Sequence, residues 1–241
     1  MKILIVRHGD PNYEIDGLTE RGKIEAELLS ERLIKETDPQ FYCSILGRAR
    51  LTVAPTLERL GAVAEYCDWL QEFSYERIAT PDGNCEHLAW DLMPAWLRDF
   101  PALYLPNEWK NVPMIRESGI PKAYDWVTSS LDALLQKHGY VREENFYRAE
   151  CPNHKTLVLV CHFGLGSVLM SHLLNCSPYS LWQNTVMLPT SVTTLYTEER
   201  EKGIAAFRCA GLGDVSHLYA NGVEPSFSAR FCECFEDDTR H

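Results

Sequence analysis

Two short apolar runs rich in β-branched residues, at residues 2–6 and 156–160, constrain the fold of this chain more than any other feature. Each run is too short for a buried helix and lacks the alternation of polar and apolar residues that a half-exposed strand shows. Such runs are typical of parallel strands that are covered on both faces. The sequence therefore predicts a parallel sheet whose strands come from distant parts of the chain.

Strand-like and helix-like segments alternate regularly over the first seventy residues. The helix that begins at Thr19 has a plausible N-cap and an amphipathic pattern, and Pro39 follows its end. This order predicts a three-layer α/β/α sandwich with a mostly parallel central sheet. The expected elements are strands at 2–6, 41–46, 62–66, 156–160, 191–197 and 205–208, and helices at 19–37, 48–60 and 163–175.

The alternation stops at about residue 73 and resumes at residue 156. The stretch 73–150 is rich in aromatic residues and contains proline-broken helical pieces, with a longer helix expected at 121–137. No Gly/Ser-rich linker separates it from the rest. We therefore expect a single domain, 1–241, with a helical lid insertion at about 73–150.

Charge and composition exclude several classes of function. The chain has 23 Lys and Arg against 34 Asp and Glu, a net charge of −11, which disfavours nucleic acid and acidic membrane surfaces as partners. No apolar stretch reaches the roughly 18 residues of a membrane helix, and the apolar start is too short for a signal peptide. The nine cysteines are odd in number and scattered, which favours reduced thiols. We expect a cytoplasmic protein without a metal site, and the sequence leaves a homodimer open.

Histidine follows both of the strongest predicted strands. His8 follows the first strand after Arg7, and His162 follows the strand at 156–160. Arg48 and Glu72 follow the second and third predicted strands. Because ligands of open α/β sheets bind at the carboxyl ends of the strands, we expect these five side chains to converge.

This set of side chains suits a phosphomonoester. Guanidinium groups bind the phosphoryl oxygens, an imidazole can attack phosphorus, and a protonated carboxyl group can neutralise the departing alkoxide. The helix that opens at Phe163 and Gly164 is also expected to aim free backbone N–H groups at the same anion. No metal ion is required for this chemistry.

Four motifs in order along the chain resemble the histidine phosphatase superfamily, which includes cofactor-dependent phosphoglycerate mutases, fructose bisphosphatases and α-ribazole phosphatases. The resemblance extends from residue 1 to about 175, with the lid unmatched. The motifs are the triplet Arg7-His8-Gly9, residues 18–22 (LTERG), residues 44–52 with Arg48, Ala49 and Thr52, and the late strand that ends at His162.

The resemblance implies a role for each matching residue. His8 is the expected nucleophile that forms a phosphohistidine, and Arg7, Arg48 and His162 are expected to hold the phosphoryl oxygens. Glu72 is the expected proton donor, with Glu76, one helical turn further on, as the alternative. Many members carry an asparagine where this chain has Glu14, so that Asn12 becomes a candidate phosphate ligand. No role is assigned to His217.

The sequence favours a phosphatase of small organic phosphomonoesters over a mutase. Phosphoglycerate mutases have Glu-Arg-His-Tyr-Gly after the acid, whereas residues 72–77 here read EFSYER. The stretch 73–150 has 8 Lys and Arg against 12 Asp and Glu, so a second phosphate would be poorly received there. Two alternatives stay open: a phosphoglycerate-mutase-type phosphotransferase, and a non-catalytic module that binds phosphate or a phosphopeptide.

Overall fold

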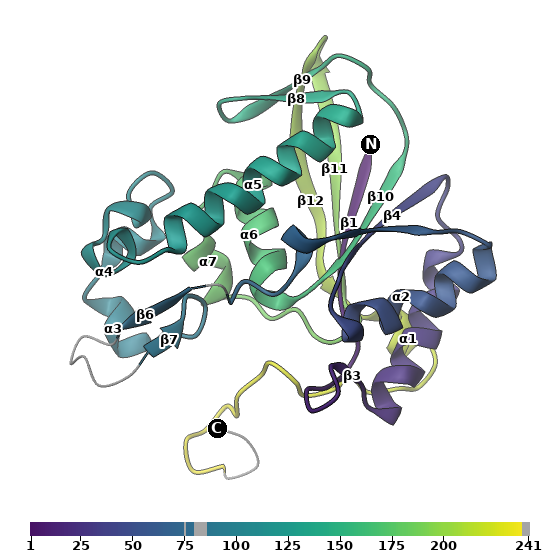
Figure 1. Cartoon of the computed structure of the whole chain (residues 1–241), viewed down its shortest axis with the longest axis horizontal. Coiled ribbons are helices and arrows are strands. Elements are labelled where there is room, and N and C mark those ends of the chain that lie inside the picture. The colour runs from purple at the N-terminus through teal and green to yellow at the C-terminus, as the bar shows by residue number, and fades with distance from the viewer. Residues whose placement is uncertain (75, 80–85, 238–241) are drawn as a thin grey trace.

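The computed structural model describes residues 1–74, 76–79 and 86–237, and it contains an eight-stranded sheet with helices on both faces (Figure 1). The strand order is β5-β4-β10-β1-β11-β12-β9-β8. The predicted three-layer α/β/α sandwich is confirmed. The strands are β1 (Lys2–Arg7), β4 (Pro39–Ser44), β5 (Ala64–Cys67), β8 (Tyr140–Glu143), β9 (Phe146–Ala149), β10 (Thr156–Cys161), β11 (Val192–Glu201) and β12 (Ile204–Asp214).

The sheet is parallel in one half and antiparallel in the other. Strands β5, β4, β10 and β1 run parallel to one another, and β11, β12, β9 and β8 continue the sheet in antiparallel pairs. The β11–β12 hairpin is longer than the runs at 191–197 and 205–208 predict, because charged residues continue β11 to Glu201 and β12 continues to Asp214, which pairs with Val192 at the start of β11.

Helices cover both faces of the parallel half. On one face, Leu4 and Val6 of β1 pack with α1 and α2, and on the other, Ile3 and Ile5 pack with α5 and α6. This burial of successive residues on opposite faces explains why the run at 2–6 shows no polar alternation. The long helices are α1 (Glu20–Leu33), α2 (Gly47–Leu60), α5 (Ile120–Lys137) and α6 (Phe163–Leu174).

Between β5 and β10 the chain builds both a separate lobe and part of the central sheet. The lobe consists of short elements at one side of the molecule, and α5 leads back from it across the sheet (Figure 1). Strands β8 and β9, which sequence patterning did not predict, then join the sheet beside β12. The short elements of the lobe are β6 (Arg77–Ala79), β7 (Glu86–Leu88), α3 (Pro94–Arg98), α4 (Pro113–Arg116) and the 3₁₀ turns Pro101–Tyr104 and Trp109–Asn111.

The remaining short elements surround the carboxyl edge of the parallel strands. A small hairpin follows β1, α7 precedes β11, and α8 follows β12. No helix among the described residues is long and apolar enough to cross a membrane. The short elements at the carboxyl edge are β2 (Pro11–Asn12), β3 (Gly17–Leu18), the 3₁₀ turn Asp68–Leu70, α7 (Pro178–Trp182) and α8 (Ser216–Tyr219).

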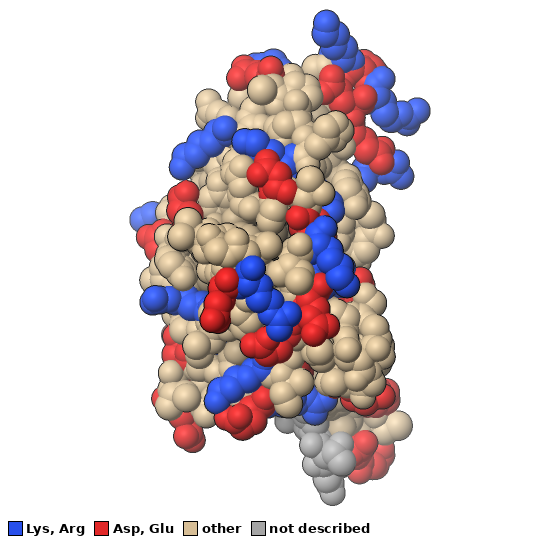
Figure 2. Space-filling view, turned by 90° about the vertical axis from the view of Figure 1, so that its right-hand side faces the viewer, with Lys and Arg blue, Asp and Glu red and all other residues tan. Residues whose placement is uncertain are grey.

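The face over α1 and α2 in Figure 2 carries interspersed acidic and basic side chains rather than a patch of one sign.

Candidate active site

Two histidine rings lie side by side at the carboxyl edge of the parallel strands. Strands β1 and β10 are hydrogen-bonded neighbours in which Arg7 pairs with Cys161, so the next residues, His8 and His162, lie at the same level. Their ring centroids are 4.9 Å apart with an interplanar angle of 57°. The convergence of the two imidazoles therefore follows directly from the register of two parallel strands.

The hydrogen bond of His8 determines which ring nitrogen can react. Nδ1 lies 2.7 Å from the carbonyl oxygen of Gly9, and only a protonated Nδ1 can donate to that acceptor. In the neutral ring, Nε2 then keeps its lone pair. Burial, together with the positive charge of Arg7, lowers the pKa of His8 well below its usual value. This environment favours the neutral imidazole, in which Nε2 is the nitrogen with the lone pair.

His162 is held by a hydroxyl group and keeps one unpaired nitrogen. Its Nε2 lies 2.9 Å from Oγ of Ser44, at the end of β4, and its buried Nδ1 has no hydrogen-bond partner among the described residues. Burial lowers the pKa of His162, and the nearby His8 and Arg48 lower it further. When Ser44 donates to Nε2, the neutral ring carries its proton on Nδ1, which is then free to donate to a ligand.

Arg7 is buried and is fixed through one end of its guanidinium group. Its Nη1 donates to the carbonyl oxygens of Met187, at 2.6 Å, and Ser228, at 3.2 Å. Its Nε is buried and has no partner among the described residues. One end of the guanidinium group is thus anchored by the protein while another of its donors needs an acceptor.

Arg48 shows the same arrangement, with a carboxylate as the anchor. Nη1 of Arg48 lies 2.6 Å from Oδ1 of Asp16, and the backbone N–H of Gly47 donates to Oδ2 of Asp16 at 2.6 Å. Asp16 thereby caps the start of α2 and compensates the unfavourable cation at that helix end. Nε of Arg48 is again buried without a partner in the described part of the chain.

Glu72 occupies the N-terminal end of α6. Its Oε1 accepts hydrogen bonds from the backbone N–H groups of Phe73, at 2.8 Å, and Leu165, at 3.0 Å, and the N–H of Gly164 also interacts with the carboxylate. The expectation that this helix end offers free N–H groups to the phosphate was therefore wrong for Gly164 and Leu165. The acidic side chain of Glu72 fills that position instead.

The environment of Glu72 favours its protonated form. Burial raises the pKa of Glu72, and this effect outweighs the backbone hydrogen bonds and the charge of Arg7, which lower it. Because Oε1 accepts the backbone hydrogen bonds, Oε2 is the oxygen left to carry a proton. Glu72 thus has the properties of a general acid.

Trp90 and Gly164 shape the wall beside Glu72. An ideal Cβ on Gly164 would lie 2.5 Å from Cδ1 of Trp90, 2.6 Å from its Nε1 and 2.7 Å from Oε1 of Glu72, so the indole ring and the carboxylate both pack against this glycine. The indole N–H of Trp90 donates to the carbonyl oxygen of Phe73 at 3.0 Å. The indole ring and the carboxylate of Glu72 therefore lie on the same side of Gly164.

The other predicted residues have different surroundings. Oδ1 of Asn12 accepts the backbone N–H of Glu14 at 3.1 Å, which stabilises its own turn. Phe163 is half-buried and packs edge-to-face against Trp90, with ring centroids 6.0 Å apart. The carboxylate of Glu76 lies against Gly119, at the start of α5.

His217 contacts the loop that bonds to the backbone of His8. Its Nε2 lies 3.2 Å from Oγ1 of Thr190, and the backbone N–H of Thr190 donates to the carbonyl oxygen of His8 at 3.2 Å. Thr190 has a φ of 56°, a conformation that is unusual for a β-branched residue. His217 therefore stabilises a strained residue next to His8, a role that the sequence did not indicate.

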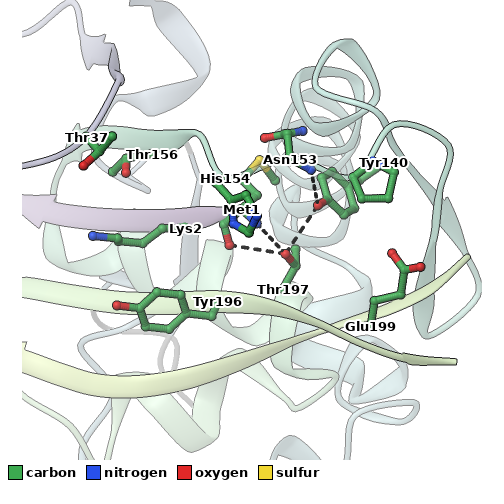
Figure 3. A pocket seen from close by; sticks show the side chains of 11 residues that line it. Met1, Lys2, Thr37, Tyr140, Asn153, His154, Thr156, Tyr196, Thr197 and Glu199 are labelled. Carbon is green, nitrogen blue, oxygen red and sulfur yellow. Dashed lines mark hydrogen bonds between the residues drawn. The ribbon is translucent and has the colours of Figure 1, made fainter. Parts of the chain in front are cut away.

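A groove of about 510 Å³ lies at the opposite edge of the sheet, beside the N-terminus (Figure 3). Its polar groups bond to one another: the amino group of Met1 donates to Thr197, and the backbone N–H of Asn153 donates to the hydroxyl group of Tyr140. At the carboxyl edge, by contrast, Nε of Arg7, Nε of Arg48 and Nδ1 of His162 are among the buried groups that have no partner in the described structure. The side chains that we expect to carry out the chemistry thus lie at the carboxyl edge.

Comparisons with known proteins show similarity in sequence and in fold. Residues 3–117 match the family model of the histidine phosphatase superfamily (branch 1). A probable phosphatase of Schizosaccharomyces pombe is 25% identical over 234 residues, which cover 90% of this chain and 95% of that protein.

Solved structures share the fold at lower identity. A phosphoserine phosphatase from Entamoeba histolytica, solved with 3-phosphoglyceric acid, has a TM-score of 0.59 at 17% identity, covering 90% of this chain and 98% of that one. A mycobacterial glucosyl-3-phosphoglycerate phosphatase has a TM-score of 0.56 at 19% identity, covering 90% and 99%.

Proposed function

We propose that the chain is a member of the histidine phosphatase superfamily and that it hydrolyses small organic phosphomonoesters through a phosphohistidine on His8, without a metal ion. One observation carries this proposal. Nε of Arg7, Nε of Arg48 and Nδ1 of His162 are buried without a partner among the described residues. An unpaired buried donor costs about 1–3 kcal/mol, and a phosphoryl group supplies several acceptor oxygens at once.

The first chemical step transfers the phosphoryl group to His8. Nε2 of His8 attacks phosphorus while the bond between phosphorus and the ester oxygen breaks, and Glu72 gives its proton to the departing oxygen. Arg7 and Arg48 stabilise the charge on the phosphoryl oxygens, as a divalent cation does in other enzymes.

The second step hydrolyses the phosphohistidine. The ionised Glu72 accepts a proton from a water molecule as that water attacks phosphorus, and the bond between Nε2 of His8 and phosphorus breaks. Inorganic phosphate leaves, and the enzyme returns with a protonated Glu72 and a neutral His8. Both steps use only groups that the site contains.

A mutase and a binding module are the alternative functions. A mutase must bind a second phosphate, which the net negative charge of residues 73–150 disfavours. A pure binding module has no need of a neutral imidazole with a free Nε2 or of a carboxyl group with a raised pKa. The names of the relatives also favour phosphatase activity.

Hydrolysis of para-nitrophenyl phosphate in the presence and absence of EDTA tests the proposal. We expect turnover that EDTA does not change and that vanadate inhibits, because vanadate mimics the pentacoordinate phosphoryl group. His8→Ala should lower kcat by several orders of magnitude, whereas His154→Ala, at an exposed histidine of the opposite edge, should leave it unchanged. A folded His8→Ala protein that keeps more than about a tenth of the rate contradicts the proposal.

A further inference from the structure

The C-terminal part of the chain crosses the loop that follows the nucleophile. Residues 224–230, which we call the strap, run past β3 near the carboxyl edge of the sheet (Figure 1). The carbonyl oxygen of Glu224 accepts a hydrogen bond from Arg21 of α1. The carbonyl oxygen of Ser228 accepts the hydrogen bond from Nη1 of Arg7 described above. The strap therefore contacts a phosphate-binding arginine of the proposed site directly.

Two carboxylates hold the strap in place. Oδ1 of Asp10 accepts hydrogen bonds from the hydroxyl groups of Ser226 and Ser228, the latter at 2.8 Å. Oε1 of Glu25 accepts the backbone N–H of Ser226 at 3.2 Å, and Oε2 accepts the backbone N–H of Asp10 at 2.9 Å. Glu25 is fully buried on α1, so its carboxylate joins the loop after His8 to the strap.

The hydroxyl groups of the strap also hydrogen-bond the carboxylate of Asp10, which would otherwise compete with phosphate for Arg7. Asp10 lies close enough to Arg7 to interact with its charge, and a free carboxylate there would compete with phosphate for the guanidinium group. Burial raises the pKa of Asp10, but the hydroxyl groups of Ser226, Thr19 and Ser228 together lower it below its usual value. Asp10 is thus an anion whose oxygens are already satisfied by neutral donors.

We propose that the strap is a positioning element of the phosphate site, with Asp10 and Glu25 as the carboxylates that dock it. Its Ser228 carbonyl, together with that of Met187, fixes Nη1 of Arg7, so that the unpaired Nε faces an incoming phosphoryl group. Ala229 has a φ of 74°, a conformation that costs about 1–2 kcal/mol in a residue with a side chain and that persists only where contacts hold it. The proposal rests on the proposed function for the identity of the ligand.

Truncation provides the first test. A chain that ends at Asn221 lacks the strap, and a matched chain that ends at Phe231 keeps it while losing the residues that follow. We expect the strapless chain to show a KM for para-nitrophenyl phosphate and a Ki for inorganic phosphate that are raised about tenfold or more, which is about 1.4 kcal/mol of binding. The chain that ends at Phe231 should match the full chain. Unchanged phosphate affinity in a folded strapless chain overturns the proposal.

A double substitution tests the docking contacts without shortening the chain. Ser226→Ala/Ser228→Ala removes both hydroxyl groups, whereas Ser226→Thr/Ser228→Thr keeps them. We expect the alanine pair to raise KM more than it lowers kcat, and the threonine pair to restore KM. A purely structural role would lower the melting temperature of the alanine pair and leave KM unchanged, which contradicts the proposal.

Direct binding separates the strap from the proposed hydrolysis. Calorimetric titration of His8→Ala protein with inorganic phosphate, with and without the strap, measures the affinity without turnover. Weaker binding without the strap supports its positioning role even if the full chain fails to hydrolyse phosphomonoesters, which would refute only the proposed reaction. Equal binding with and without the strap refutes the positioning role even if hydrolysis is observed.

Discussion

Replacing Gly164 by alanine should impair proton donation by Glu72 while leaving phosphate binding unchanged. The new Cβ would lie 2.5–2.7 Å from Trp90 and Oε1 of Glu72, whereas carbon and oxygen atoms in contact need about 3.5 Å, so these groups must move by about 1 Å. A displacement of that size costs about 10²-fold in rate when it misplaces a reacting group. We therefore expect kcat for an alkyl phosphate to fall about 100-fold, equivalent to about 2.7 kcal/mol.

The assay compares two leaving groups and a second glycine in the same helix. Nitrophenolate needs little protonation, so para-nitrophenyl phosphate should lose only a few-fold in rate. Gly166→Ala is the control, because its Cβ would lie 3.1 Å from Sδ of Met187, a flexible side chain that can yield. Equal losses on both substrates in Gly164→Ala, or equal losses in both variants on the alkyl phosphate, would refute the reasoning.

Three further outcomes are expected. Glu72→Gln should remove the alkaline limb of the pH profile of kcat/KM for alkyl phosphates, because a general acid is active only below its pKa, which is raised here. If the alkaline limb is the same in Glu72→Gln, another residue is the acid, and Glu76 is the next candidate. Asp16→Ala should raise KM about tenfold because Arg48 becomes less ordered, and it should lower the free energy of unfolding by about 1 kcal/mol because the helix cap is lost. Asp16→Asn should retain more of the cap. Initial rates measure the change in KM, and urea titration measures the change in stability. Burial lowers the pKa of His217 to about 4, so the contribution of His217 to stability is complete above the unfolded-state pKa of about 6.5 and is lost as the pH falls towards 4. We therefore expect the free energy of unfolding, measured by urea titration at pH 7 and pH 5, to depend less on pH in His217→Gln than in the unchanged protein. Equal pH dependence in the two proteins contradicts the assignment.

The central features of the fold and site could be predicted because they depend on local patterns. Runs of apolar residues buried on both faces identified β1 and β10, and parallel strands place the residues after them at one edge. His8 and His162 follow from that geometry alone. Strands β8 and β9 were missed because they pair with β12, far along the chain, and their partly polar residues resemble a surface loop.

The anchors of the site could not be predicted for a different reason. Asp16 contacts Arg48 from a residue with a φ of 46°; the pair Asp16-Gly17 is typical of a turn, but it does not indicate which side chain the carboxylate contacts. Ser228 contacts Arg7 across 221 positions of sequence and does so through a backbone carbonyl oxygen, which every residue carries. The sequence therefore indicates candidate side chains for the proposed chemistry, whereas the groups that orient them become visible only in the folded structure.

The opposite pKa shifts of His8 and Glu72 have one common cause, which is burial. The proposed phosphoryl transfer needs a neutral His8 and a protonated Glu72 at the same time. With ordinary pKa values of 6.5 and 4.5, each group has the required form in only about a tenth of molecules at pH 5.5, and both together in about one in a hundred. Burial disfavours the charged form of either group, so it lowers the pKa of the imidazole and raises that of the carboxyl group. In the proposed reaction, burial thus favours the required combination of a neutral His8 and a protonated Glu72.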